Sequence, residues 1–482
     1  MYGPVFSVSR AGGEPTQITQ EDAFAAALSP DGRTLATLMK EEANGQRQRA
    51  LTLSSPPGAN GKRLKVFPGS AAQHRLAWSP DGNKILFWLQ SPFSIWLADV
   101  RSGEVKQIVT PPGTIWLNFS WFPDSRHVAI SWPRENTSQD RTDLWILDNV
   151  TGQRSLLIPT TEDAADPSVS PDGKAIAFQS GRLDFDLLEL PLDASPVRSL
   201  VVTRQFEDSA VWSPVASEYV YVTQESIWLR RRDSVGHDSE PRLVVSANVF
   251  VGGEPFRQFR FASPSFSPDG TRIAYVAGFR GKRQGWISPL SGGPPAPLGQ
   301  FTGVGGLTWS PDGQWIAFNW TPMEAGGDRL AKIRVGSGEP AILADAGCAF
   351  SPEWSPDSSR ILCSKGGVLY TIPADGGSPA FLGKEYEPLA TWSREMRYIY
   401  AIRNANGKRQ LGKLDWKTGA FQPLTDIPAE WNINTPVLGG VRLSLSPDGK
   451  TLATTVIKPI GDIWILEGFQ PPPTLWQRLL RH

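Results

Sequence analysis

The stretch Trp309-Ser310-Pro311-Asp312-Gly313 decides the fold, because the same pattern returns along the chain at a nearly constant spacing. The tetrapeptide Ser-Pro-Asp-Gly starts at six serines: Ser29, Ser79, Ser170, Ser267, Ser310 and Ser446. Near or degenerate copies start at Phe122, Ser213, Ser355 and Ser393, so that ten repeats begin 38 to 54 residues apart. A period of this length is typical of the blades of a β-propeller.

Two apolar positions accompany every copy of the tetrapeptide. The residue just before it is apolar in all ten repeats: Leu28, Trp78, Trp121, Val169, Trp212, Phe266, Trp309, Trp354, Trp392 and Leu445. The residue six positions after its start is apolar as well: Leu35, Ile85, Val128, Ile176, Tyr219, Ile273, Ile316, Ile361, Ile399 and Leu452. Pro presets φ for a turn, Asp accepts hydrogen bonds within it, and Gly adopts the left-handed conformation. Each repeat therefore predicts a β-hairpin with the two apolar residues on its buried face.

Each hairpin is followed by an alternating third strand, such as residues 143–148, then by a Gly turn and a short fourth strand, such as residues 105–109. Four strands in this order make one propeller blade, so we expect an all-β β-propeller of about ten four-stranded repeats. Because a ring usually holds about 4–8 blades, the repeats predict either two propellers or one large ring.

The domain boundaries that we expect follow from the repeat count. Residues 1–203 would form a first propeller or partial propeller of about four and a half repeats, residues 204–470 a second of about six, and residues 471–482 a C-terminal tail. The chain starts inside a blade, since residues 5–10 read as a third strand and residues 15–19 as a fourth. Either strands from both termini complete one blade, or the chain is a piece of a longer protein.

The repeat also resembles a known family. The unit Trp-Ser-Pro-Asp-Gly, followed by Ile316-Ala317-Phe318 and by third strands such as residues 462–466, resembles the Pro-Asp variety of WD40-like repeat in TolB-type propellers. The stretch from Val5 to Thr19 is similar to TolB-like regions fused to bacterial serine/threonine kinases or winged-helix regulators. The resemblance implies a non-enzymatic module for protein binding or ligand sensing, in an extracytoplasmic, periplasmic setting, as part of an envelope or signalling protein.

Composition excludes several classes of function. Lys plus Arg and Asp plus Glu both number 48, so the basic excess of a nucleic-acid-binding protein is missing. No apolar run approaches the ~18 residues of a membrane span, and Met1 is not followed by a signal-peptide pattern, so a cytoplasmic location stays open. The four histidines, His74, His127, His237 and His482, are scattered over the sequence, and we expect neither a metal site nor a cofactor.

Two enzymatic functions are alternatives to a binding role. A serine hydrolase lacks support, because no Gly-x-Ser-x-Gly nucleophile elbow occurs in the chain. A carbohydrate-active lyase or hydrolase with its site at the propeller mouth stays as the alternative function. It requires two histidines or two carboxylates that converge within about 9 Å.

Acidic residues recur in the loops that lead into the first strands of several repeats. They are Glu21, Asp22, Glu162, Asp163, Glu207, Asp208, Glu385, Glu387 and Glu430. Loops of this kind gather at one face of a propeller, where an acidic mouth would attract a cation or a basic peptide. The alternative is that these side chains only cap turns and solvate loops. We take the nine residues as candidate partner-binding positions.

The two cysteines, Cys348 and Cys363, flank the turn at Pro356. In a regular hairpin Cys363 would face a residue near Pro352, which leaves Cys348 roughly 13 Å further along its strand. A disulfide requires Cα atoms within about 7 Å, so the hairpin register predicts two free thiols, with Cys363 directed inward.

Overall fold

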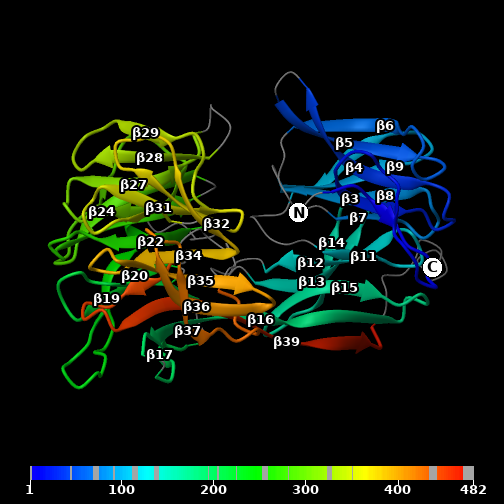
Figure 1. Cartoon of the computed structure of the whole chain (residues 1–482). Helices are drawn as coiled ribbons and strands as arrows, with labels where there is room; N and C mark the ends of the chain where they lie inside the picture. The colour runs from blue at the N-terminus through cyan, green and yellow to red at the C-terminus, as the bar shows by residue number, and fades with distance from the viewer. Residues whose placement is uncertain are drawn as a thin grey trace. The chain divides into compact units, whose positions relative to one another are not determined.

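The computed structural model describes residues 3–43, 46–68, 75–90, 93–110, 118–134, 141–193, 195–203, 206–223, 225–251, 259–279, 282–322, 328–349, 351–433 and 442–469. These residues are mostly β-strand (Figure 1), and one helix of four residues lies among them, α1 (Asn248–Val251). Eight antiparallel sheets contain four strands each, hydrogen-bonded in chain order, which confirms the predicted propeller fold. By its internal contacts the chain divides into unit 1, Met1–Arg182 with Ile460–His482, and unit 2, Leu183–Pro459.

Unit 1 contains three complete blades. Blade 1 consists of β3 (Ala23–Leu28), β4 (Leu35–Ala43), β5 (Gln46–Ser54) and β6 (Lys62–Pro68). Blade 2 consists of β7 (Leu76–Trp78), β8 (Lys84–Gln90), β9 (Phe93–Asp99) and β10 (Val105–Val109). Blade 3 consists of β11 (Phe119–Trp121), β12 (His127–Pro133), β13 (Thr142–Asp148) and β14 (Arg154–Ile158). A hairpin of β1 (Phe6–Ser7) and β2 (Thr16–Gln17) precedes them, and a bridge between Gly3 and Ala23 joins it to β3.

Unit 2 contains five complete blades. Blade 5 consists of β18 (Glu207–Trp212), β19 (Glu218–Thr223), β20 (Ser226–Arg231) and β21 (Arg242–Ser246), and blade 6 of β22 (Arg260–Phe266), β23 (Arg272–Phe279), β24 (Lys282–Pro289) and β25 (Ala296–Pro297). Blade 7 consists of β26 (Val304–Trp309), β27 (Trp315–Trp320), β28 (Arg329–Arg334) and β29 (Pro340–Ala344). Blade 8 consists of β30 (Glu353–Trp354), β31 (Arg360–Lys365), β32 (Val368–Pro373) and β33 (Ala380–Lys384), and blade 9 of β34 (Tyr386–Trp392), β35 (Tyr398–Ala405), β36 (Lys408–Asp415) and β37 (Phe421–Asp426).

The remaining two blades share two long strands, β16 (Ala175–Pro191) and β39 (Thr451–Glu467), which pair with each other (Figure 1). Blade 4 consists of β15 (Asp163–Val169), β16 up to Arg182 and β39 from Ile460. Blade 10 consists of β38 (Ser444–Leu445), β39 up to Pro459, β16 from Leu183, and β17 (Arg198–Val201). In the other repeats a hairpin joins the second strand to the third, whereas here both strands run straight on and each repeat supplies the third strand of the other.

Two glycines permit the close approach of these long strands. A Cβ atom on Gly181 would lie 2.4 Å from the carbonyl oxygen of Ile460 and 2.7 Å from Cα of Gly461. Any larger residue at Gly181 would push the two backbones apart, because real Cβ atoms do not approach backbone atoms so closely.

The division differs from the predicted boundaries. The strand β17, placed by the sequence in the first propeller, belongs to blade 10 of unit 2, and the residues from Ile460 return to unit 1. The predicted tail 471–482 lies outside the described residues.

The turns have the predicted geometry. In blade 2, Ser79 Oγ donates to Asp81 Oδ1 at 2.6 Å, the Asn83 amide donates to the same oxygen at 3.0 Å, and Gly82 has a φ of 69°. The same Ser-to-Asp bond forms in the turns that start at Ser29, Ser170, Ser267, Ser310, Ser355 and Ser446. The tetrapeptide is therefore a self-contained turn held by its own side chains.

In blades 2 and 3 the residue before the turn is bonded to the preceding blade. The indole of Trp78 donates to the carbonyl of Ala27 in blade 1 at 2.9 Å, and the indole of Trp121 donates to Ala77 in blade 2 at 3.3 Å. At the end of unit 2, the Trp212 amide donates to Ser444 Oγ at 2.9 Å and so joins blade 5 to blade 10.

Unit 2 is a closed ring of six blades. One core cluster packs Leu188 and Leu452 of blade 10 with Leu389 of blade 9, and another packs Leu187 and Ala453 of blade 10 with residues of blade 5 such as Trp212. Blade 10 thus has a packed neighbour on both sides, and its strands come from two distant segments of the chain. This arrangement closes the ring, because blade 10 packs face to face against blade 9 and against blade 5.

The prediction of two free thiols is wrong. Cys348 and Cys363 form a disulfide with a Cα–Cα distance of 5.1 Å. The prediction assumed one regular strand from Cys348 to Trp354, but β30 covers only Glu353–Trp354, and the Ala349 amide donates to the Ser364 carbonyl at 2.7 Å. The irregular segment before β30 therefore brings Cys348 beside β31, and Cys363 is buried as predicted.

Candidate interaction site

The inner strands of unit 2 carry charged groups that bond across the ring. Arg442, just before β38 in blade 10, donates from Nη2 to the carbonyl of Leu307 in blade 7 at 2.5 Å. Burial lowers the pKa of Arg442, and the charge of Glu353 in blade 8 opposes this shift. Burial raises the pKa of Glu353, whose Oε1 accepts a hydrogen bond of 3.3 Å from Thr391 in blade 9. These polar groups tie four blades together.

In unit 1, polar residues just before the first strands of blades also link one blade to the next. Arg75 of blade 2 donates from Nη1 to Asn118 Oδ1 of blade 3 at 3.0 Å and to Asp166 Oδ1 of blade 4 at 3.4 Å. The side chains of Arg75 and Asp166 are 41% and 53% exposed, so this contact is open to solvent. In both units the polar residues of the inner strands hold blades together.

Five of the nine predicted acidic positions lie at the surface or half-buried. Glu21 and Glu430 are exposed, and Asp22 is half-buried. Glu162 lies 3.3 Å from Arg182, and Glu385 lies 3.3 Å from Arg403, measured between the charged atoms.

The other four are buried or half-buried at the start of first strands and have partners in the protein. The Asp163 carboxylate accepts from the Thr142 amide at 2.8 Å, and burial raises its pKa. Glu387 is buried against Arg409 with an N–O distance of 2.5 Å. These contacts give the two side chains a structural role. The binding role predicted for the nine acids stays a proposal.

Asp208 and Glu207 are the most deeply buried of the nine. Asp208 Oδ1 accepts from the Ser209 amide at 2.6 Å and from Thr455 Oγ1 at 2.8 Å, and burial raises its pKa. Burial also raises the pKa of Glu207 to about 7, and the charges of Asp184 and Asp186 add to the shift.

The side chain of Glu207 is 2% exposed. Its Oε1 accepts a hydrogen bond from the hydroxyl of Thr203, and its Oε2 is buried without a hydrogen-bond partner in the described chain. The neighbouring Asp186 is paired with a cation, since Lys458 Nζ lies 2.8 Å from its Oδ2. The sequence singled out Glu207 as a loop acid but missed Asp184 and Asp186, because they lie on a different strand, β16.

The described histidines do not converge. His127 is buried, and its Nδ1 lies 2.5 Å from Asp124 Oδ2 within the turn of blade 3. His237 is exposed and lies 3.5 Å from Asp233, while His74 and His482 are outside the described residues. Within the described part of the chain, no group of three or more His, Cys, Asp or Glu side chains could hold a metal ion.

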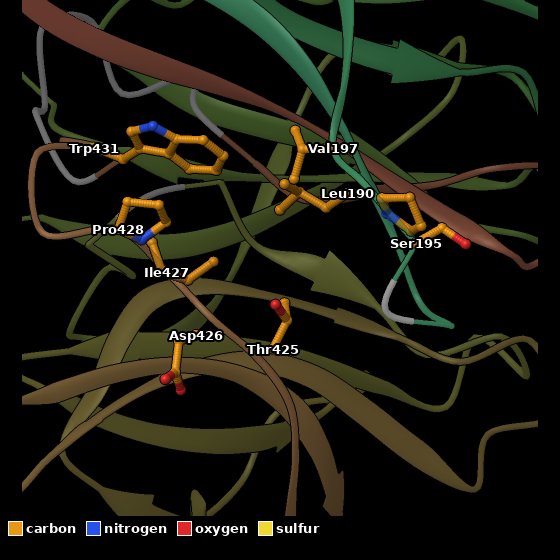
Figure 2. Close-up of a pocket in the computed structure, with 9 residues that line it drawn as sticks. Leu190, Ser195, Val197, Thr425, Asp426, Ile427, Pro428 and Trp431 are labelled. Carbon is orange, nitrogen blue, oxygen red and sulfur yellow. The ribbon is translucent and has the colours of Figure 1, made fainter.

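A small apolar cavity of about 250 Å³ lies in unit 2 between blades 9 and 10. Figure 2 shows its lining side chains coming from two segments, the end of β16 with the residues after it and the end of β37 with the residues after it. The lining residues are Leu190, Pro191, Ser195, Val197, Thr425, Asp426, Ile427, Pro428 and Trp431. No charged group other than Asp426 lines it, so the cavity offers little to orient a polar ligand.

The most unusual surface is the third strand of blade 4. Ile463, Trp464 and Ile465 on β39 are 81%, 57% and 65% exposed, and we call them the back end of blade 4. Their counterparts in blade 3 by sequence are Leu144, Trp145 and Ile146, of which Leu144 and Ile146 are 0% and 4% exposed. Those two residues pack against residues of blade 4.

Blade 1 also has an exposed apolar residue, on the face that is directed away from blade 2. Leu28 holds the position that is bonded to the preceding blade in blades 2 and 3, and we call it the front end of blade 1. It is 53% exposed, whereas Trp78 at the same position of blade 2 is 8% exposed. Among the described residues, no core cluster joins blade 4 to blade 1, so unit 1 is an open arc of blades.

Sequence reasoning placed residues 462–466 on a third strand but did not identify them as exposed. The sequence does contain an indication of this exposure, because no fourth-strand pattern lies between residues 462–466 and the run Pro471-Pro472-Pro473.

Comparison with solved structures finds chains that are similar to this one at low sequence identity. A protein from Agrobacterium tumefaciens assigned as TolB is 17% identical, with 58% of this chain and 100% of that chain covered and a TM-score of 0.45. TolB from Acinetobacter baumannii is 15% identical over 72% and 79% of the two chains, with a TM-score of 0.25. An oligogalacturonate lyase from Vibrio parahaemolyticus is 14% identical over 79% and 96%, with a TM-score of 0.27.

No protein-family model matches the chain, and no curated protein matches it in sequence. The fold assignment therefore rests on the blades themselves. Within the described residues, no helix has the length and apolar character of a membrane span.

Proposed function

We propose that this chain is a non-enzymatic protein-interaction propeller that binds a partner through the back end of blade 4. The observation that carries the proposal is the exposure of Ile463 and Ile465 at positions where blade 3 buries Leu144 and Ile146, together with the exposed Trp464 between them. A cluster of exposed apolar residues at a sheet edge is costly in water and favours strand pairing with another chain. Aromatic residues such as Trp464 are also enriched at the centres of protein interfaces.

The proposed setting is the sensor or scaffold part of a bacterial envelope or signalling protein outside the cytoplasm. Two considerations support it: the TolB-like repeat pattern and the disulfide between Cys348 and Cys363, since disulfides persist mainly in oxidising compartments. The exposed acids Glu21 and Glu430 are a second, weaker candidate surface, for a basic peptide.

Site-specific photo-crosslinking tests the proposal. With p-benzoylphenylalanine in place of Trp464, irradiation of cells that express the full chain should give a protein adduct. Val235, which is 77% exposed in unit 2, serves as the control position and should give none. An absence of adducts at Trp464, or equal adducts at both positions, would contradict the proposal.

A carbohydrate-active lyase or hydrolase is the second candidate, because one observation favours it. Glu207 has a pKa raised to about 7 and lies near Asp184 and Asp186, and a general acid requires a carboxyl group that holds its proton near neutral pH. Assays with oligogalacturonates and other glycans test this candidate. Turnover by the wild type that is lost in Glu207→Gln would support it, and absence of turnover would eliminate it.

A further inference from the structure

We propose that the partner of the back end of blade 4 is the front end of blade 1 in a second copy of this chain. Two open arcs would then close one ring of eight blades, four from each copy. This inference rests on the proposed function and specifies its partner.

The back end of blade 4 and the front end of blade 1 correspond to the two sides of an interface that exists inside the chain, between blades 3 and 4. Between blades 3 and 4, Val169 packs in the same core cluster as Ile146. Leu28 occupies the repeat position of Val169, and Ile465 occupies the position of Ile146. A second copy would therefore offer Leu28 to Ile465 in the same arrangement in which Val169 meets Ile146.

The exposed fractions show that the back end of blade 4 lacks a neighbouring blade to cover it. Ile146 is 4% exposed because blade 4 covers it, while Ile465 is 65% exposed. The hairpin beside β3 adds two further exposed apolar residues near the front end, Phe6 at 53% and Val8 at 60%. Both surfaces are apolar, and removal of apolar area from water favours association.

Symmetry makes a second copy a self-consistent partner. A front end and a back end on one arc allow two copies to form two identical junctions about a two-fold axis, and the assembly then closes without leaving an open end. Eight blades is at the upper limit of the usual range of about 4–8 blades in one ring.

Sedimentation equilibrium of the full chain tests the inference. The wild type should have twice the chain mass at micromolar concentration, and Ile465→Asp and Leu28→Asp should each raise the dimer dissociation constant at least 100-fold. Ile342→Asp is the matched control, because Ile342 is 46% exposed on blade 7 of unit 2, and it should leave the dimer unchanged. A monomeric wild type at 100-fold higher concentration, or a dimer that tolerates Ile465→Asp, would overturn the inference.

Mixing the two variants tests the front-to-back geometry. A mixed dimer of Ile465→Asp with Leu28→Asp has one junction with both native residues and one with both aspartates. It should therefore form more readily than a homodimer of either variant, in which each junction contains one aspartate. No heterodimer above the level of the homodimers would overturn front-to-back packing.

The crosslink at Trp464 separates this inference from the proposed function. An adduct with twice the mass of the chain supports both. An adduct with a different protein keeps the proposed function and overturns the second copy as the partner, and no adduct overturns both.

Discussion

Unit 2 is a closed ring and unit 1 is an open arc, although both are built from the same repeat. In unit 2, blade 10 takes strands from two distant segments and packs against blades 9 and 5 on its two sides. In unit 1, blade 4 receives its third strand from the far end of the described chain, and its outer edge has no partner strand among the described residues. The difference teaches that a repeat specifies its own blade and one neighbour, whereas closure of a ring depends on strands from segments that lie far apart in the chain.

The largest expected effect lies in the closed ring, at Arg442. Replacing Arg442 by Ala leaves the buried carboxyl of Glu353 without its counter-charge and removes the bond to Leu307 across the ring. We expect a loss of about 3–5 kcal/mol in the free energy of unfolding, measured by urea titration.

The double variant Arg442→Met with Glu353→Gln is the control for that measurement. It removes both charges and should regain most of the stability, since a neutral pair requires no counter-charge. A loss below ~1 kcal/mol for Arg442→Ala would mean that the ring does not depend on this link.

Glu207, also in unit 2, should make stability depend on pH. Its pKa rises from 4.5 to about 7 on folding, so the folded state holds an extra proton between these values. The contribution is fully present below pH 4.5 and is lost as the pH rises through 7, which amounts to about 3 kcal/mol.

The variant Glu207→Gln should therefore gain stability over the wild type at pH 8 and little or none at pH 4.5. Thermal unfolding of both proteins across this range measures the difference between them, which removes the contributions of the other acids. A difference that does not change with pH would refute the assignment.

The disulfide in blade 8 should stabilise unit 2 against unfolding and should have no effect on the stability of unit 1. Its two cysteines are 15 residues apart, and closing a loop of that size stabilises a protein by about 3 kcal/mol. The double variant Cys348→Ser with Cys363→Ser should lose about that amount in urea unfolding. Dithiothreitol should lower the stability of the wild type similarly and leave the double variant unchanged, whereas an effect of the reductant on the double variant would point to another cause.

The smallest effect is expected for a matched pair of leucine variants, whose losses of stability compare the two units directly. Leu28 and Leu445 hold the same repeat position, but Leu28 is 53% exposed and Leu445 packs against the core between blades 9 and 10. Leu445→Ala should cost about 2 kcal/mol, and Leu28→Ala less than about 0.5 kcal/mol. Both are measured by urea unfolding at concentrations where the chain is monomeric, and equal losses would mean that the front end of blade 1 is packed.

The sequence by itself determined the blade. The Ser-Pro-Asp-Gly turn is held by its own side chains, and the apolar residues around it repeat at constant positions, so local information was sufficient for turn, strand order and buried face. The residues of the candidate surface were also placed correctly on a third strand. Their exposure was missed, because exposure depends on whether a neighbouring blade is present.

Only the tertiary structure decided which strands share a blade. The second strands β16 and β39 carry the same pattern as every other second strand, so no local signal separates a hairpin from an exchange of third strands between blades 4 and 10. The disulfide was missed for a related reason, since it depends on an irregular segment that departs from the strand pattern. A repeated sequence offers many equivalent pairings, and the choice among them depends on contacts between residues far apart in the chain.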